Sequence, residues 1–154
     1  MTDTFSADLS RIAEKYRGQL KQVCQESARD LYNEVSSGGD FSPGTPIANP
    51  SLWKEPRPHV GGFARGSWSA SLNGMPGEGA GTAGEADAQV EATIEGLKVG
   101  DTLMVANRAP YIRRLEYDAH STQAPDGFVR PAVEAWHLIV DRIIARVVGS
   151  GSVR

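Results

Sequence analysis

The stretch from Pro110 to Arg130, PYIRRLEYDAHSTQAPDGFVR, holds the three side-chain types of a hydrolytic triad close together. Asp118 could orient an imidazole, His120 could act as a general base, and Ser121 could act as a nucleophile. Triads are normally assembled from distant segments, because side chains on one short loop do not readily align these three groups. The chain also lacks the Gly-x-Ser-x-Gly turn of α/β-hydrolases. We therefore expect a structural helix exit here, and the alternative is a small hydrolase or nuclease that uses His120 and Asp118.

Other side chains that could bind a metal or a phosphate lack the spacing for it. His59, His120 and His137 share no metal-ligand spacing. The glycine-rich run from Gly74 to Thr82 has no Gly-Lys-Ser/Thr, so it does not match a phosphate-binding P-loop. We expect a mobile surface loop here, with an interaction role as the alternative. Cys24 is the single cysteine, which excludes an internal disulfide and a four-cysteine metal site. We expect no catalytic, cofactor or metal site, and no enzyme activity.

The charged residues favour contacts to protein over contacts to nucleic acid. The net charge is −3 and the pI is about 5.6, whereas a duplex-DNA binder neutralises many phosphates with lysine and arginine. Arg113 and Arg114 cannot point the same way on a helix, so one is expected to pair with Glu116, Asp118 or a carbonyl and the other to face solvent or a partner. Four arginines cluster in this part of the sequence: Arg108, Arg113, Arg114 and Arg130.

Length and composition predict one globular domain without a membrane segment. The chain has 154 residues, of which 40% are hydrophobic and 23% are charged, as is usual for a single globular domain. The N-terminal residues lack the basic and apolar regions of a secretory signal, and no apolar run approaches the ~20 residues that span a bilayer. We expect no membrane partner and an intracellular protein where it is made.

Hydrophobic periodicity predicts a long first helix from Ser6 to about Ser37. At 1.5 Å per residue this helix would be roughly 48 Å long, whereas a compact domain of this size is about 30–35 Å across. Another subunit should therefore cover part of its apolar stripe. The stripe comprises Leu9, Ile12, Ala13, Tyr16, Leu20, Val23, Cys24, Leu31 and Val35.

The rest of the chain predicts an α+β fold with a small antiparallel or mixed sheet and a C-terminal helix packed on it. Strands are expected at 67–72 and 102–107, and helices at 85–97, 109–118 and 129–148. The last helix has an apolar stripe of Val133, Trp136, Val140, Ile143, Ile144 and Val147. The predicted domain spans residues 1–148, with loop arms at 38–62 and 73–85 and a flexible tail at 149–154. Two strands are marginal, so the Pro-rich segment or a neighbouring subunit should extend the sheet.

Two segments resemble one protein family. Residues 61–68, GGFARGSW, resemble its T-G-R-x-R-G-x-W segment, and residues 107–117, NRAPYIRRLEY, resemble its N-x-x-P-Y-A-x-x-L-E-Y-G segment. The family is that of the tailed-bacteriophage tail-completion, or minor tail protein Z-like, proteins. Gly61, Phe63 and Asp118 depart from its pattern, as does the long insert at 74–84. The positions that carry the resemblance, and that we expect to pack or to contact a partner, are Arg65, Gly66, Trp68, Pro110, Tyr111, Arg113, Arg114, Leu115, Glu116, Tyr117, Gln123, Pro125 and Gly127.

The resemblance implies structural work in a virion. A member of this family would form a homo-oligomeric ring, sixfold by analogy, in the neck or tail end, where it completes the tail and helps join it to the head. Its expected partners are other neck and tail proteins such as the tail terminator, the tail tube or the head-completion protein. DNA would pass through the ring without sequence-specific binding. The expected location is the virion, after synthesis and assembly in the cytoplasm of the bacterial host.

Overall fold

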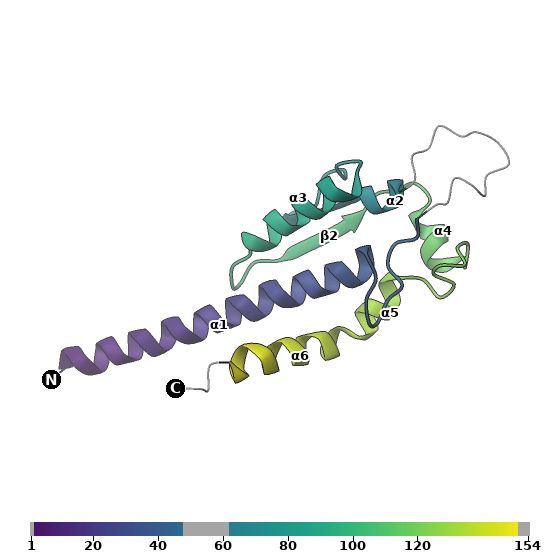
Figure 1. The fold of residues 1–154 in the computed structure, drawn as a ribbon. Helices are drawn as coiled ribbons and strands as arrows, with labels where there is room; N and C mark the ends of the chain where they lie inside the picture. The colour runs from purple at the N-terminus through teal and green to yellow at the C-terminus, as the bar shows by residue number, and fades with distance from the viewer. Residues whose placement is uncertain (1, 48–61, 151–154) are drawn as a thin grey trace.

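The computed structural model describes residues 2–47 and 62–150, with side chains from Phe5 onward. It has a long N-terminal helix, a two-stranded antiparallel sheet and C-terminal helices, so the predicted α+β class is confirmed at this level. The elements in chain order are α1 (Thr2–Ser36), α2 (Phe63–Gly66), β1 (Trp68–Leu72), α3 (Ala83–Glu95), β2 (Leu103–Asn107), α4 (Ile112–Tyr117), α5 (Val129–Glu134) and α6 (Trp136–Gly149) (Figure 1).

Some expectations fall on residues outside this description. These are His59, Gly61, most of the loop arm at 38–62 and the end of the tail at 149–154. A strand added by the Pro-rich segment would likewise lie within the undescribed residues 48–61.

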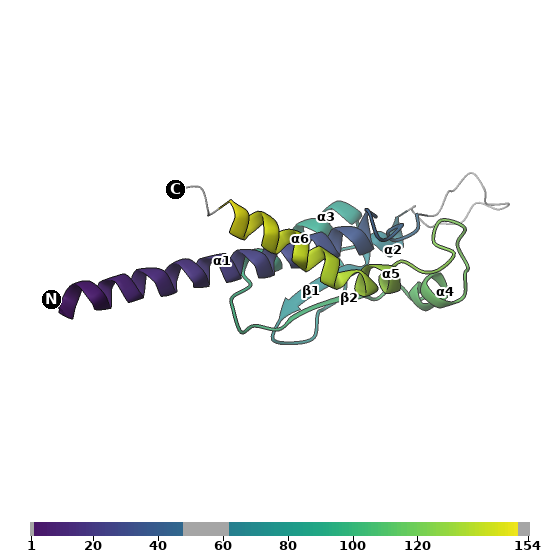
Figure 2. The same cartoon turned by 90° about the horizontal axis from the view of Figure 1, so that it is seen from below.

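The N-terminal half of α1 projects from the body of the molecule (Figure 2). The side chains from Phe5 to Gly18 are all exposed, whereas those from Val23 to Ser36 are mostly buried or half-buried. The sequence supports helix on both sides of this boundary through one continuous apolar periodicity. The predicted first helix is therefore confirmed, and about half of it is not packed within the chain.

Helix α6 runs antiparallel to α1 and is held to it by charged as well as apolar contacts (Figure 1). Arg146 pairs with Glu26 of α1 at 2.7 Å, and Arg142 lies 3.5 Å from Asp30 of α1. The expectation that the C-terminal helix packs on the sheet is wrong, because its buried side chains form a stripe that faces α1. That stripe consists of Ile139, Ile143 and Val147.

The predicted last helix is two helices, and its apolar residues occupy two faces. Ala135, with ψ of 2°, separates α5 from α6. Ile143 and Val147 are buried, as the predicted stripe requires. Val133 and Ile144 belong to the other face and stay 56% and 41% exposed. The single predicted stripe therefore divides into a buried face and an open apolar face.

The sheet is short and its β1 edge is closed by a side chain. Trp68 lies opposite Asn107 at one end of the pairing, and Leu72 lies opposite Leu103 at the other, as the two predicted strands require. On the outer edge of β1, the side-chain amide of Gln89 in α3 accepts from the backbone N–H of Ala70 and donates to its carbonyl oxygen. This amide replaces a third strand at that position, so α3 both covers and closes β1.

The glycine-rich loop at 73–85 packs on β1 and β2 over part of its length. Ser69 donates to the carbonyl oxygen of Gly77 at 2.7 Å, and Arg108 donates to that of Pro76 at 2.7 Å. Pro76 is itself buried. The loop is therefore attached to the sheet over this part, because Ser69 and Ser71 of β1 face it and donate to its carbonyl oxygens.

The core is centred on Trp68. Its indole meets Tyr32 and Phe128 edge-on, with ring centroids 6.2 and 6.4 Å away. Its Nε1 donates to Thr45 Oγ1 at 2.9 Å, and that hydroxyl in turn donates to the carbonyl oxygen of Val35. One side chain thus connects the sheet, α1, the loop after α1 and the start of α5.

We expect Trp68→Ala to lower the free energy of unfolding by about 3–5 kcal/mol, because it empties a buried site and leaves Thr45 without its donor. Tyr111→Ala is the matched aromatic control and should cost much less, since Tyr111 is 41% exposed. Urea denaturation followed by circular dichroism measures both. Equal losses would contradict the central position of Trp68.

Candidate assembly surface

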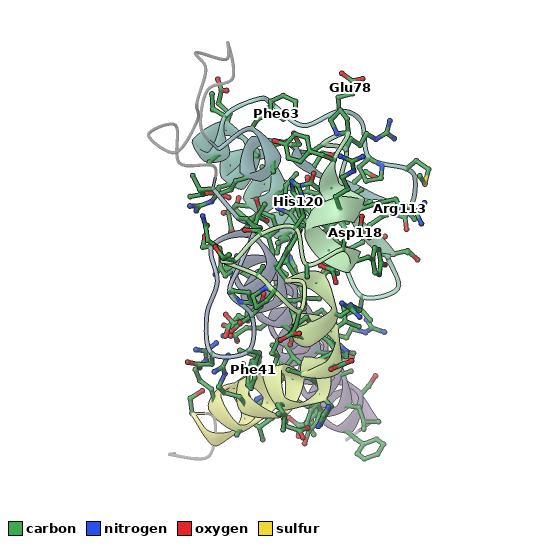
Figure 3. The ribbon with its side chains drawn as sticks, turned by 90° about the vertical axis from the view of Figure 1, so that its right-hand side faces the viewer. Phe41, Phe63, Glu78, Arg113, Asp118 and His120 are labelled. Carbon is green, nitrogen blue, oxygen red and sulfur yellow. The ribbon has the colours of Figure 1, made fainter. Side chains whose placement is uncertain are left out.

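The three polar side chains after α4 do not form a triad. Asp118 and His120 are exposed, and the chain turns between them at Ala119, whose φ is 49° (Figure 3). Ser121 Oγ accepts a hydrogen bond from the backbone N–H of Gln123. Within residues 62–150, no hydrogen bond joins Asp118, His120 and Ser121 to one another. This arrangement is a polar helix exit, as the sequence predicted.

The described part of the chain bears on metal ligands and on membrane-spanning helices. Across residues 2–47 and 62–150, no three His, Cys, Asp or Glu side chains come together as metal ligands would. In the same residues, no helix combines the length and the apolarity that a membrane crossing needs.

Glu116 is the buried polar centre of the segment. Its carboxylate accepts from the backbone N–H groups of Phe128, Val129 and Arg130 at 2.8–2.9 Å. These groups belong to the start of α5, whose own residues provide no side-chain cap. Burial by itself raises the pKa of Glu116, but the N–H donors and the Arg130 guanidinium outweigh it and leave the pKa below its ordinary value. Glu116 is thus a cap supplied from α4 to α5.

Gly127 is required by the close approach of its backbone to Glu116. Its φ is +84°, and a Cβ there would lie 2.6 Å from the carbonyl oxygen of Glu116. Arg130 completes this connection between α4 and the start of α5, which we call the Glu116 joint (Glu116, Gly127 and Arg130). It donates to the carbonyl oxygens of Glu116 and Asp126 and stacks 5.4 Å from the ring centre of Tyr117. The guanidinium that pairs with Glu116 is therefore that of Arg130, not that of Arg113 or Arg114.

A second buried glutamate does the same work at the end of α1. Glu34 accepts from the backbone N–H groups of Asp40, Phe41 and Ser42 at 2.9–3.0 Å. Ser42 Oγ then donates to the carbonyl oxygen of Phe128 at 2.6 Å, which links this loop to the Glu116 joint. Sequence analysis did not identify Glu34. Its position on the apolar side of the helix, just before Gly38-Gly39, could have indicated a buried role.

The first motif is also structural. Arg65 donates to Ser37 Oγ at 2.7 Å and approaches Asp87 at 3.5 Å. At Gly66, a Cβ would lie 2.5 Å from the carbonyl oxygen of Gly81. With the buried Trp68, these residues bind the glycine-rich loop and α3 to the end of α1.

The remaining motif residues divide into buried and exposed positions. Leu115 is buried, and the Gln123 amide exchanges two hydrogen bonds with the backbone of Ile47. Tyr111 and Tyr117 were expected to be packing anchors, but they are 41% and 61% exposed because α4 lies at the end of the molecule (Figure 3). The other exposed members are Pro110, Arg113, Arg114 and Pro125.

An exposed apolar stripe lies on the projecting half of α1, which we call the arm (residues 5–20). Its apolar side chains recur at spacings of four, three, four and four, so they lie on one face. Isolated exposed apolar residues are normal on a protein surface, but a contiguous stripe marks an interaction site. The stripe consists of Phe5 (69% exposed), Leu9 (51%), Ile12 (48%), Tyr16 (65%) and Leu20 (49%).

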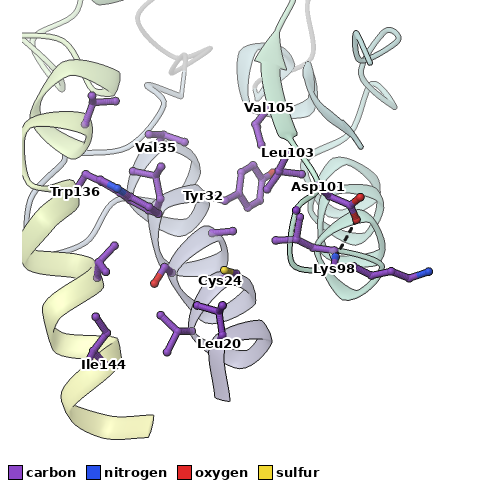
Figure 4. Close-up of a pocket in the computed structure, with 18 of the residues that line it drawn as sticks. Leu20, Cys24, Tyr32, Val35, Lys98, Asp101, Leu103, Val105, Trp136 and Ile144 are labelled. Carbon is purple, nitrogen blue, oxygen red and sulfur yellow. Dashed lines mark hydrogen bonds between the residues drawn. The ribbon is translucent and has the colours of Figure 1, made fainter. Parts of the chain in front are cut away.

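An open apolar groove of about 710 Å³ lies next to the arm (Figure 4). Its floor is the face of α1 from Leu20 to Val35, one wall is the open apolar face of α5 and α6, and the other wall comes from residues 97–105. Cys24 and Ser27 lie on the floor among apolar neighbours. Ser27 is 2% exposed, and its hydroxyl has no hydrogen-bond partner among the described residues.

Sequence analysis predicted the uncovered stripe of the first helix but missed the groove. The signal that could have found it was the breadth of the last stripe, because Val133, Trp136 and Ile144 lie off the face of Ile143 and Val147. A helix that is apolar on two faces needs two partners. Among the described residues, α6 packs mainly on α1.

Comparisons of the chain with protein-family models, with curated proteins and with solved structures found no match.

Replacement of the Gly127 hydrogen by a methyl group tests the joint. Gly127→Ala should destabilise the protein by more than the about 1–2 kcal/mol that a left-handed residue with a Cβ costs. Gly100→Ala is the matched control, since Gly100 has a φ of +99° with nothing within 4 Å of its Cβ position. Thermal unfolding of the two variants isolates the contact with Glu116, and equal losses would show that this contact is unimportant.

Glu116→Gln should lower the free energy of unfolding by about 1–3 kcal/mol at pH 7, because an amide cannot accept all three N–H groups. The folded-state pKa of Glu116 lies below its ordinary 4.5, so its contribution is present above that value and is lost as the pH falls through the folded pKa. The difference between wild type and variant should therefore shrink below about pH 4. Denaturant titrations from pH 7 to pH 3 measure it, and a constant difference would contradict an ionised cap.

Proposed function

We propose that this chain is a structural virion protein of a tailed phage, a ring subunit of the neck or tail end that completes the tail and helps join it to the head. The observation that carries the proposal is the pair of unpartnered apolar surfaces, the arm and the groove, on one chain. Both surfaces need a protein partner to leave water, and a subunit that repeats around a ring supplies one at each boundary.

The energetics favour assembly over a monomeric role. Burial of a Phe, Leu or Ile side chain contributes about 1.5–3 kcal/mol. On the arm, the side chains of Phe5, Leu9 and Ile12 are 69%, 51% and 48% exposed. The body of the protein cannot cover them, because α1 carries them beyond α6 (Figure 2). Contacts between unlike surfaces of identical subunits generate rings when the rotation closes, and they leave no arm unpartnered.

The resemblance to tail-completion proteins is supported by what its residues do in the fold. Glu116, Gly127 and Arg130 hold the start of α5 to α4, and Arg65 holds α2 to the end of α1. These are joints of a scaffold, as a building unit requires. Arg113 and Arg114 remain exposed on α4, where they can contact another neck or tail protein.

The charge of the protein agrees with a channel that lets DNA pass. A net charge of −3 provides little counterion-release affinity for phosphates, so DNA would slide through the ring without being held. The hydrolase alternative receives no support from the described residues, where His120 and Asp118 are exposed and share no hydrogen bond.

The test is genetic and structural. We expect that a phage genome that carries this reading frame with an early stop codon yields filled heads and tails that do not join into infectious particles. Supply of the wild-type protein in trans should restore the titre and incorporate the chain into purified virions. Complete infectious particles without the chain would reject the proposed function.

His120→Ala, supplied in the same complementation assay, should restore the wild-type titre, because an exposed imidazole after α4 packs against nothing that assembly needs. Leu115→Asp is the matched structural control and should fail, since Leu115 is buried. A loss of titre with His120→Ala, in a protein that still folds and enters virions, would revive the hydrolytic alternative.

A further inference from the structure

We propose that the arm of one copy docks in the groove of the next copy, head to tail, as a helix in an apolar groove. This contact rests on the proposed function only in that a ring needs a repeating contact between subunits. The occupant is thus a second copy of this chain, and the segment of it that docks is the face of residues 5–20.

The two surfaces match in length. The arm stripe runs from Phe5 to Leu20, and the groove floor runs from Leu20 to Val35. Each spans 15 helical steps, which is about 22 Å at 1.5 Å per residue. An arm laid along the groove would therefore meet apolar surface over its whole stripe, in the manner of an amphipathic helix read by anchors at i, i+4 and i+7.

The chemistry of the groove also fits the arm. Val133, Trp136 and Ile144 on one wall face Leu103 and Val105 on the other, so an apolar helix face would be covered from both sides (Figure 4).

Tyr16 suits an apolar groove that is open on one side. It lies in the middle of the arm stripe, is 65% exposed and carries a phenolic hydroxyl on an apolar ring. Its ring can therefore pack in the groove while its hydroxyl stays at the open side.

Opposite net charges add a long-range attraction. Residues 5–20 contain three basic and two acidic residues, a net charge of +1. Residues 21–154 contain 13 basic and 16 acidic residues, a net charge of −3. The arm is therefore a basic segment on an acidic body, which favours the approach of an arm to the body of another copy over arm-to-arm approach.

The position of the arm makes the contact heterologous. Arm and floor are consecutive parts of one straight helix, so the arm cannot fold back into its own groove. Each subunit then gives one arm and receives one, and the chain of contacts ends only when a ring closes.

The single native cysteine allows a direct test. Cys24 lies in the groove, and arm positions 9, 12 and 16 can be changed to cysteine one at a time in the full chain (Leu9→Cys, Ile12→Cys, Tyr16→Cys). A short bis-maleimide, which adds one thiol at each end, should then join the arm of one copy to Cys24 of the next. We expect a ladder of dimer, trimer and higher species on denaturing gels.

Controls separate this contact from its rivals. Ala7→Cys and Glu14→Cys lie on the opposite face of the arm and should give at least tenfold less product. The stripe variants with Cys24→Ser should give none, and circular dichroism confirms that each variant is folded. Crosslinking that persists with Cys24→Ser would show that arms pair with arms, and would overturn the proposal.

Two other results would also overturn it. One is the absence of crosslinks at all three stripe positions at every protein concentration tested. The other is a lipid or other apolar small molecule found in the groove by native mass spectrometry of the purified protein. A ladder formed by a chain that is absent from virions would reject the proposed function and leave the arm-in-groove contact standing. A chain that is present in virions but forms no crosslinks would support the proposed function and reject the arm-in-groove contact.

Discussion

The structure depends on two buried carboxylates that each bind three backbone N–H groups. Glu116 accepts hydrogen bonds from backbone N–H groups at the start of α5, and Glu34 accepts them from the loop that follows α1. A buried carboxylate is stable only when such donors replace water. Ser42 joins the two sites through the carbonyl oxygen of Phe128. Together they fix the direction in which α5 and α6 return along α1.

That return path determines which apolar faces are buried and which stay open. Because α6 runs back along α1, it buries Ile139 and Ile143 against that helix. Its second apolar face is left opposite β2, with α1 between them as a floor, and the result is the groove. α1 meanwhile continues past the end of α6 and becomes the arm. The buried carboxylates at one end of the molecule set the path of α6, and that path determines where the apolar surfaces stay open.

The segment after α4 holds the side-chain types of a triad, but no hydrogen bond joins them to one another among the described residues. Asp118, His120 and Ser121 are neighbours in sequence, yet the turn at Ala119 leaves the first two exposed and apart from Ser121. The chemistry of the segment lies instead in Glu116, which a reading of triads would pass over. Its task is to satisfy N–H groups, and the lowered pKa of its carboxyl is the consequence of that task.

The sequence by itself determined the long first helix, the two strands, the alternation that buries Trp68 and the stripe that the chain cannot cover, because all of these follow from local periodicity. It also predicted the polar exit after Tyr117. Only the tertiary structure decided that Glu34 and Glu116 are caps, since their donors lie 6–8 and 12–14 residues away along a folded path. Likewise, the groove exists only once α6 lies along α1. Periodicity indicates which side chains avoid water, whereas packing decides which of them find a partner within the same chain.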